Sequence, residues 1–510
     1  MFRPIGQINN ARDKKFFIEK INLFIRLIHV FKEHRKLGNC KIESTVNDFT
    51  NLRLQALEII SSDIERDHKL LTTLLKQDLY SQFISAINFN IKYKAEISDL
   101  LDKLEPSKRK ILQKNAEAKK KYRVIDLFCG AGGLSLGFIQ EGFQIDLAND
   151  NEDVCIETFK YNHPEISNER IVLGDIKEIK DHLNDHLVDE IDVVVGGPPC
   201  QGFSYVNQQR IIDDPRNELY KFFIEAISKI LPKFVIMENV RGMLPFAEQV
   251  KEDFKNIRVK KNKEFISYDL DYKVLVSDQF GVAQKRPRLI FFAIRSDISN
   301  SKHISSLDFF NMIEKETSNL KTHILKDALE YIKPLEAPRK KNMTEVDDGV
   351  TGKKVDVNKY KGNENSYLKL INQDKKIKYI FNHKARYAND INYEIYSTLA
   401  QGEDGTSEKI KHIMPYQHRN HIFKDKYFKL EANKPSRTIT AHLRMDCHSH
   451  IHPTQSRSIT PREAARIQSF PDDYLFLGPY LKTYMQIGNA VPPLMAKYIA
   501  KVIKKYLDII

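Results

Sequence analysis

The clearest indication of the fold class is the sequence Val124-Ile125-Asp126-Leu127-Phe128-Cys129-Gly130-Ala131-Gly132-Gly133-Leu134. Its first five residues are apolar apart from one aspartate, which is typical of a buried strand. The glycines that follow tolerate positive φ angles and let the backbone approach a ligand closely. A strand, a glycine-rich turn and a helical pattern in this order predict the first unit of a ligand-binding α/β sheet.

Six further short apolar runs alternate with helical patterns after this unit. They cover residues 143–148, 171–173, 191–195, 234–237, 272–276 and 289–294. Such alternation predicts an open, largely parallel sheet with helices on both faces.

The flanking segments differ in texture from this α/β region, which we assign to residues 121–298. Residues 1–120 repeat apolar residues every three or four positions, which predicts a helical extension. Residues 299–432 are polar, rich in Lys and Asn, and loop-like, as an inserted recognition domain would be. Residues 433–510 then rejoin the α/β domain.

The charge is distributed unevenly along the chain. The chain of 510 residues has 81 Lys and Arg against 68 Asp and Glu, a net charge of +13. Residues 1–120 carry +8, 121–300 carry −6, 301–430 carry +6 and 431–510 carry +5. An acidic middle between basic arms suits an enzyme that holds a polyanion at its periphery. Solvated Lys-rich faces explain the charge equally well.

The cysteines and the N-terminal region point to a cytoplasmic protein without a membrane partner. Five scattered cysteines form neither a disulfide framework nor a metal site. The most apolar early stretch, residues 16–30, carries Glu19, Lys20 and Arg26, so it predicts an amphipathic helix. No secretory signal is visible.

Acidic residues follow the second and third strands where a nucleoside would bind. The loop reads Gly-Ala-Gly-Gly and lacks the dinucleotide pattern, so it suits a nucleoside with an amino-acid tail. Asp150 lies 24 residues after Asp126 and could accept both ribose hydroxyl hydrogens. Asp175 could hold an adenine amino group. A tight turn without a ligand is the alternative.

A stiff loop follows the fourth strand and presents a cysteine. The loop reads Gly196-Gly197-Pro198-Pro199-Cys200-Gln201-Gly202-Phe203-Ser204. Cys200 therefore stands at the carboxyl end of a parallel strand, where open α/β sheets bind ligands. A free thiol titrates near about 8.5, so a nucleophilic role requires a nearby cation or loop amides. A buried filler role suits the other cysteines better.

Five ordered motifs give the chain a family resemblance. They are the glycine loop, Pro198-Pro199-Cys200-Gln201-Gly202-Phe203-Ser204, Glu238-Asn239-Val240, Gln284-Lys285-Arg286-Pro287-Arg288 and Gly488-Asn489-Ala490-Val491-Pro492-Pro493. The chain resembles the DNA (cytosine-5)-methyltransferases of bacterial restriction–modification systems over residues 122–297 and 433–500. The resemblance implies a Rossmann-like S-adenosylmethionine-dependent methyltransferase domain with an inserted target-recognition domain.

The resemblance also implies how the chemistry is divided. Cys200 adds to carbon 6 of a flipped cytosine, and carbon 5 then becomes nucleophilic. Glu238 shares a proton with ring N3, and Arg288 holds O2 and lowers the pKa of the thiol. Arg286 belongs to the same catalytic set, in which one arginine only buttresses the site.

The remaining expected contacts fall into two sets. The residues expected to bind S-adenosyl-L-methionine are Asp126, Phe128, Gly130, Ala131, Gly132, Gly133, Asp150, Asp175, Ile176, Pro199, Leu219 and Asn489. The residues expected to contact DNA are Gln201, Ser204, Arg210, Gln284, Arg437 and Thr438. The alternative for Arg210 is an ordinary surface charge. We expect a monomer that acts on double-stranded DNA and protects it from a cognate restriction endonuclease.

Two other functions fit parts of the sequence. An RNA (tRNA) cytosine-5 methyltransferase would carry the same motifs, although a variable domain of roughly 130 residues favours duplex DNA. A DNA-binding regulator would act through the N-terminal helices, whose charge of +8 has no assigned role.

Overall fold

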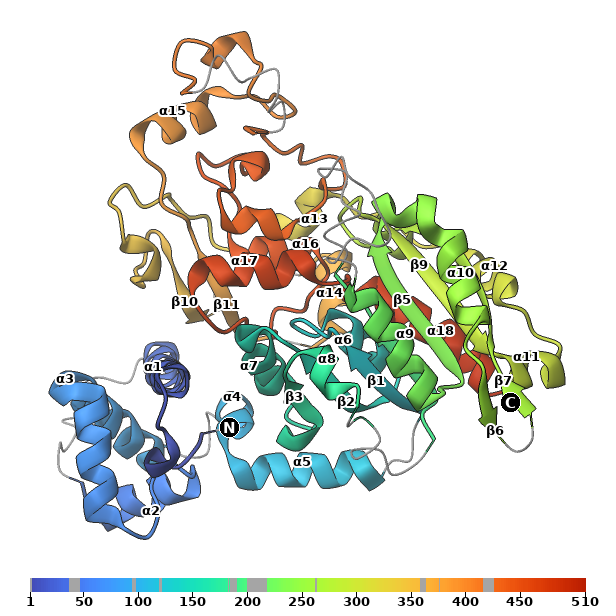
Figure 1. Ribbon diagram of the computed structural model, residues 1–510. Helices are drawn as coiled ribbons and strands as arrows, with labels where there is room; N and C mark the ends of the chain where they lie inside the picture. Colours follow the sequence, from blue (N-terminus) through green and yellow to red (C-terminus); the bar gives the residue numbers. More distant parts are fainter. Residues whose placement is uncertain are drawn as a thin grey trace.

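Seven strands form one twisted sheet at the centre of the molecule (Figure 1). The computed structural model describes residues 2–35, 46–93, 98–118, 122–181, 183, 190–199, 218–261, 264–357, 364–375, 377–415 and 426–510. The strands are β1 (Arg123–Leu127), β2 (Gln144–Asp150), β3 (Ile171–Leu173), β4 (Val193–Gly196), β5 (Phe234–Val240), β8 (Tyr268–Val276) and β9 (Pro287–Arg295). Their order is β3-β2-β1-β4-β5-β9-β8. Pairing is parallel from β3 to β5, and β9 runs antiparallel to both of its neighbours. The predicted strands and the largely parallel sheet are confirmed.

Both faces of the sheet are covered by helices, because each strand alternates its apolar side chains between two cores. In β9, Ile290 and Phe292 join one core, whereas Leu289 and Phe291 join the other. The first core includes α6 (Gly133–Gln140), α12 (Ser306–Thr317) and α18 (Pro493–Leu507). The second includes α8 (Ile176–Ile179), α9 (Glu218–Ile230) and α10 (Ala247–Lys255). This is the Rossmann-like arrangement that the sequence predicts.

The N-terminal segment is helical and packs on the rest of the chain. Its helices are α1 (Ala11–Arg35), α2 (Asp48–Ala56), α3 (Ile64–Lys92), α4 (Ser98–Leu101) and α5 (Pro106–Ala118). Their apolar core is continuous with Val355 and Phe381 of a hairpin and with Leu475 and Leu477. Figure 1 shows α1, α4 and α5 near α7 (Asp153–Asn162), with β9 on the far side of the sheet. The extension is therefore more than a solvated appendage.

The segment 299–432 is more ordered than we expected from its composition. It contains α12, α13 (Leu325–Leu329), the hairpin of β10 (Gly352–Val357) and β11 (Tyr379–Lys384), α14 (Ser366–Asn372) and α15 (Asp390–Thr398), after α11 (Ser296–Lys302). Phe309, Phe310 and Ile313 of α12 lie in the core of the sheet. The expectation that this segment is loop-like was wrong, because its many polar residues obscure the short apolar pattern of α12 in the sequence.

The last segment returns to the sheet as predicted. Thr460 caps α16 (Pro461–Ile467), and α17 (Tyr480–Asn489) and α18 follow. A Cβ added at Gly137 would lie 2.4 Å from Ala496 Cβ, so α6 and α18 touch along their backbones. A second, two-stranded hairpin pairs β6 (Val259–Lys261) with β7 (Glu264–Ile266). No helix in the described ranges combines the length and apolar character needed to cross a bilayer.

Candidate active site

The carboxyl ends of the parallel strands open onto one cavity of about 630 Å³. Most of the predicted site residues meet there, although they come from distant parts of the sequence. Those lining the cavity are Phe128, Gly130, Gly133, Asp150, Asp175, Ile176, Pro199, Leu219, Glu238, Arg286, Arg288 and Asn489. Open α/β sheets bind ligands at this edge, so the cavity is the candidate active site.

The glycine loop after β1 has the special backbone that its sequence predicts. Phe128 has φ of 62° and Gly130 has φ of 54°. A Cβ at Gly130 would meet no atom within 4 Å, because this residue faces the open cavity. At Gly133 a Cβ would lie 2.3 Å from the carbonyl oxygen of Val491, so the C-terminal segment packs directly on this loop.

Asp150 at the end of β2 fixes the glycine loop and faces the cavity. Its Oδ2 accepts a hydrogen bond of 2.9 Å from the amide of Gly130, and its Oδ1 accepts one of 2.8 Å from Glu152. Burial raises the pKa of this carboxyl above its ordinary value. Each oxygen can accept a further hydrogen bond, so Asp150 can still bind a pair of hydroxyl groups.

Three residues of the predicted cofactor set do not line the cavity. Asp126 is fully buried, and its Oδ2 accepts a hydrogen bond of 2.6 Å from Ser135. Burial raises the pKa of Asp126 to about 7. The Ala131 carbonyl accepts a hydrogen bond from Tyr474, and Gly132 packs against the same tyrosine. These three residues support the loop from behind in this structure.

Cys200 lies outside the described residues, as do Gln201, Ser204 and Arg210. The segment that leads to the cysteine is described up to Pro199. Asn239 of β5 donates a hydrogen bond of 3.2 Å to the carbonyl of Pro198. This bond ties Pro198 to β5 at the wall of the cavity, which Pro199 and Glu238 also line.

Glu238 and Arg288 form an ion pair at the cavity wall. They extend from the adjacent strands β5 and β9, and Arg288 Nε lies 2.7 Å from Glu238 Oε1. Each side chain is 12% exposed. A carboxyl group next to a guanidinium can recognise a flat heterocycle that presents both a ring nitrogen and a carbonyl oxygen.

Arg286 joins three segments beneath this pair. Its guanidinium is fully buried and donates to the carbonyls of Ile439 at 2.6 Å and Gly488 at 2.9 Å. Gln284 is equally buried; its amide donates to Gln468 at 2.6 Å and accepts from the Ile439 amide at 2.6 Å. Both arginines line the cavity, but Arg286 donates to the backbone of two other segments, whereas Arg288 pairs with Glu238. The DNA contact of Gln284 stays a prediction that would require this face to open.

The hinge residues Arg437 and Thr438 lie on the neighbouring segment. The guanidinium carbon of Arg437 is 4.6 Å from the centre of the Phe428 ring. Thr438 is half-buried, and its hydroxyl donates a hydrogen bond of 3.0 Å to the Lys285 carbonyl. Their contacts with DNA remain predictions.

The sequence missed several residues of the cavity wall. They include Asn149, Glu152, Cys155, Thr440, Ala441, Met485 and Gln486. Asn149 donates to the carbonyls of Val172 at 3.1 Å and Gly174 at 3.0 Å, so it holds β2 against β3. The position of Asn149 next to Asp150 could have predicted its place at the cavity, whereas nothing in the sequence around Met485 indicates a site residue. Burial raises the pKa of the Cys129 and Cys155 thiols, as expected for fillers.

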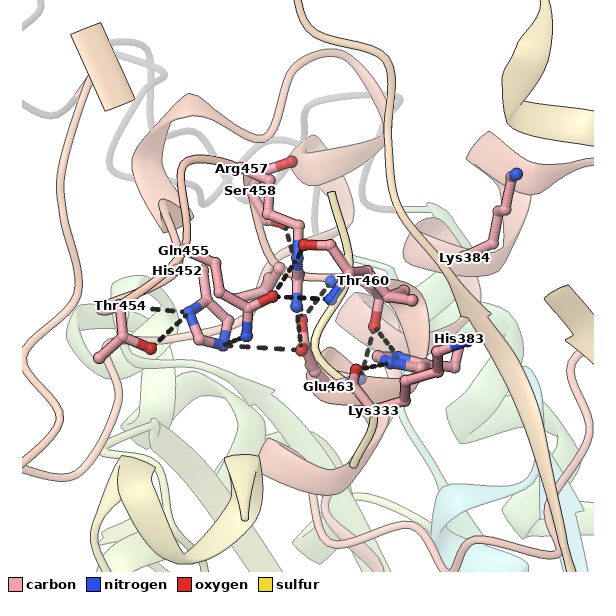
Figure 2. Close-up of polar contacts among 12 residues, drawn as sticks. Lys333, His383, Lys384, His452, Thr454, Gln455, Arg457, Ser458, Thr460 and Glu463 are labelled. Atoms are coloured by element: carbon pink, nitrogen blue, oxygen red, sulfur yellow. Dashed lines mark hydrogen bonds and ion pairs between the residues drawn. The ribbon is translucent and has the colours of Figure 1, made fainter. Parts of the chain in front are cut away.

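A second cluster of polar groups lies away from the cavity, around α16 (Figure 2). Arg457 donates to both oxygens of Glu463, at 2.8 and 2.6 Å, and both side chains are fully buried. Thr460 donates its amide to the same carboxylate at 2.7 Å. His452 and His383 complete the cluster, and burial lowers the pKa of His383 to about 4 and that of His452 to about 3.

The family of C-5 cytosine-specific DNA methylases matches residues 122–505, three quarters of the chain. This chain belongs to that family. It is a DNA cytosine-5 methyltransferase. Because the match begins at residue 122, helices α1–α5 lie outside the part that defines the family.

Related proteins cover the same part of this methyltransferase. Type II methyltransferase M.AgeI of Thalassovita gelatinovora is 31% identical in an alignment that covers 75% of this chain and 99% of the relative. Type II methyltransferase M1.HphI of Haemophilus parahaemolyticus is 31% identical and covers 75% of this chain and 86% of the relative. A crystal structure of an Escherichia coli protein, described as a DNA modification methyltransferase encoded within a prophage, superimposes with a TM-score of 0.52. It shares 26% identity over 76% of this chain and 99% of its own.

Proposed function

We propose that this methyltransferase uses S-adenosyl-L-methionine to modify cytosine within one specific duplex DNA word, through a covalent adduct with Cys200. The observation that carries the proposal is the cavity that joins Asp150 on one side to the Glu238–Arg288 pair on the other. One end offers the contacts of a nucleoside, and the other offers those of a cytosine.

The residues of the cavity fit the proposed cofactor. Asp150 would accept the ribose hydroxyls, Asp175 the adenine amino group, and the open face of Gly130 would admit the methionine end. The wall carries the acidic groups of Asp150, Glu152, Asp175 and Glu238, which suit a cationic sulfonium. When bound, this cofactor supplies an electrophilic methyl group.

The residues of the chain would activate the cytosine. The Cys200 thiolate adds to carbon 6, and the displaced electron pair makes carbon 5 nucleophilic. Glu238 would donate a hydrogen bond to N3 as negative charge develops there, while Arg288 stabilises O2. The adduct ends when a base removes the carbon-5 proton and the thiolate leaves.

The target cytosine must leave the duplex to reach this cavity, and unstacking costs a few kcal/mol. We propose that Gln201, Ser204, Arg210, Gln284, Arg437 and Thr438 offset part of this cost through contacts with DNA. Residues 299–432 would read the bases, as the target-recognition domain.

The proposal is tested in two steps. Bisulfite sequencing of DNA from cells that express the chain identifies the methylated word. A duplex that carries 5-fluorocytosine at that position should then form a denaturation-resistant adduct with the protein, since the carbon-5 proton is replaced. Cys200→Ala should abolish the adduct and the turnover, whereas Cys447→Ala, which removes a buried cysteine outside the cavity, should retain both. An adduct in Cys200→Ala would contradict the nucleophile.

The biological setting is part of the same proposal. We propose that the enzyme is a monomer located with bacterial DNA and that its methylation protects that DNA from a cognate endonuclease. The type II relatives support this setting. DNA from expressing cells should resist an endonuclease that cuts the identified word, and light scattering should give the mass of one chain.

A further inference from the structure

Helix α1 of the N-terminal domain touches both walls of the cofactor end of the cavity. One wall comes from the start of α7, through Glu152 and Cys155. The other comes from α17, through Met485, Gln486 and Asn489. Between these walls themselves, one ion pair of 3.0 Å joins Lys482 to Glu152, and both of its side chains are partly exposed. Leu477 and Leu475, just before α17, also donate amide hydrogen bonds to the α7 side chains of Thr158 at 2.9 Å and Asn162 at 3.0 Å. Helix α1 packs behind both walls and adds to these connections.

The first contact behind the walls is apolar. Phe16 of α1 is 5% exposed and shares a small cluster with Val154 and Cys155 of α7 and Met485 of α17. Two members of this cluster, Cys155 and Met485, also line the cavity. The phenylalanine ring therefore packs in the same cluster as a residue from each wall.

The second contact is polar and fixes the beginning of α17. The Glu19 carboxylate accepts hydrogen bonds from the Gly478 amide at 2.5 Å and from Lys354 Nζ at 2.9 Å. Lys354 also donates to the Gly478 carbonyl at 3.2 Å. Gly478 has φ of 96°, and a Cβ there would lie 2.9 Å from Val154. Glu19 and Lys354 thus hold both peptide groups of a residue that only glycine suits.

Two ion pairs attach α1 to α7 as well. Lys20 lies 2.7 Å from Glu157, and Arg12 lies 3.4 Å from Asp153. A cavity of about 260 Å³ lies between the two helices beside these contacts, so part of the interface is loosely packed. A loosely packed interface concentrates the coupling in a few side chains, which makes single substitutions informative.

We propose that α1 is an internal brace for the cofactor site, in which Phe16 and Glu19 are positioning residues that set the distance between α7 and α17. The inference rests on the proposed function, since it takes the cavity to bind S-adenosyl-L-methionine. The brace would give the N-terminal segment a role in cofactor affinity, although this segment lies outside the residues matched by the methylase family.

The test compares substitutions at these two residues in the full-length protein. Phe16→Ala should raise the dissociation constant for S-adenosyl-L-methionine about tenfold, a typical coupling between packed sites, and raise its KM in parallel. Glu19→Gln should raise both about threefold, because the amide still accepts from Gly478 but loses its charge interaction with Lys354. The KM for DNA and the kcat at saturating cofactor should stay within twofold of wild type. Phe16→Met, which keeps an apolar chain in the cluster, should restore most of the affinity.

Matched controls remove the same groups from exposed sites of the same domain. Phe49 is 70% exposed and Glu65 is also exposed, so Phe49→Ala and Glu65→Gln should leave every constant unchanged. A purely structural role would lower the active fraction of Phe16→Ala and leave its KM for the cofactor unchanged, which would overturn the brace. Wild-type affinity in both variants would overturn it too. If the wild-type chain itself bound no S-adenosyl-L-methionine, the proposed function would fail together with the brace.

Discussion

Two glutamate–arginine pairs in this molecule have similar chemistry and different surroundings. Glu238 and Arg288 meet at 2.7 Å, are each 12% exposed, and face the cavity. Glu463 and Arg457 meet at 2.6 and 2.8 Å and are fully buried. Burial and ion pairing alone therefore do not distinguish a site of chemistry from a structural bond.

The difference lies in how the hydrogen-bonding capacity is used. Both Glu463 oxygens accept from Arg457, and one also accepts from the Thr460 amide. The remaining guanidinium Nε–H of Arg457 donates to the Leu335 carbonyl and to Gln455. Glu238, by contrast, has Gly197 beside it and the open cavity in front. A buried pair is available for catalysis where unfilled space adjoins it.

The largest expected effect comes from breaking the Glu238–Arg288 pair, which is the open pair because it faces the cavity. Glu238→Gln should lower kcat about 10²- to 10⁴-fold, because an amide cannot share a proton with the base. The melting temperature should change little, since Arg288 can be solvated from the cavity. Transfer of a labelled methyl group to DNA and a thermal melt measure both quantities. Glu248→Gln, on the exposed face of α10, is the matched control. A fully active Glu238→Gln enzyme would remove this residue from the mechanism.

Breaking the fully buried Glu463–Arg457 pair, the closed pair, should have the opposite pattern: a large loss of stability and little loss of activity. Glu463→Gln leaves Arg457 buried without a counter-charge, which costs about 3–5 kcal/mol of unfolding free energy. Urea denaturation measures the loss. Methyl transfer by the folded fraction at low temperature should remain near wild type, since Glu463 does not line the cavity. Unchanged stability together with lost activity would refute the contrast between the two pairs.

The sequence predicted the central sheet well, since its strands combine apolar runs with glycine turns. Local patterns also placed Asp150 and Glu238 correctly at strand ends, where the fold brings them to one cavity. The closed pair was not predicted, although the Thr460-Pro461-Arg462-Glu463 sequence is a capping box and could have indicated that Glu463 is engaged.

Other features depend on tertiary packing, which no local pattern reports. Arg286 and Arg288 are alike in sequence, and their different partners follow from the approach of Ile439 and Gly488, which lie 153 and 202 residues further along the chain than Arg286. Phe16 looks like any residue on an amphipathic helix until α7 and α17 are packed against it.

Three buried histidines, two of them in the cluster around α16, should also make stability depend on pH. Burial lowers the pKa of His383 to about 4 and those of His450 and His452 to about 3. In the unfolded chain these groups titrate near about 6.5, so between pH 6.5 and 4 the unfolded state binds protons that the native state does not. Stability should therefore fall as the pH drops through this range, by about 2 kcal/mol per histidine at pH 5.

Urea denaturation midpoints measured at pH 7 and pH 5 give the slope of stability against pH. His452→Asn keeps an acceptor for the Thr454 amide and should reduce the slope, whereas His303→Asn, at an exposed position, should not. Equal slopes in wild type and His452→Asn would mean that His452 does not contribute.

The smallest expected effect on stability has the opposite pH dependence and comes from Asp126, behind the glycine loop. Burial raises the pKa of Asp126 to about 7, against about 3.9 for an unfolded aspartate. Between these values the native state binds a proton that the unfolded state has lost, so the contribution of Asp126 to stability falls as the pH rises from 4 to 7. Asp126→Asn removes this pH dependence. At pH 8 it should stabilise the protein by only about 1 kcal/mol, because the cost of burying unpaired amide hydrogens offsets most of the free energy gained by removing the buried charge.

The same variant distinguishes support of the glycine loop from binding of the cofactor. Asp126 is fully buried behind the loop and pairs with Ser135, so Asp126→Asn should change the affinity for S-adenosyl-L-methionine less than threefold. Asp150→Asn, one strand away and facing the cavity, should weaken it at least tenfold, since a charge-assisted hydrogen bond is worth about 1.5–3 kcal/mol. Equal losses in the two variants would mean that both carboxylates contact the cofactor, and that the wall of the cavity moves when it binds.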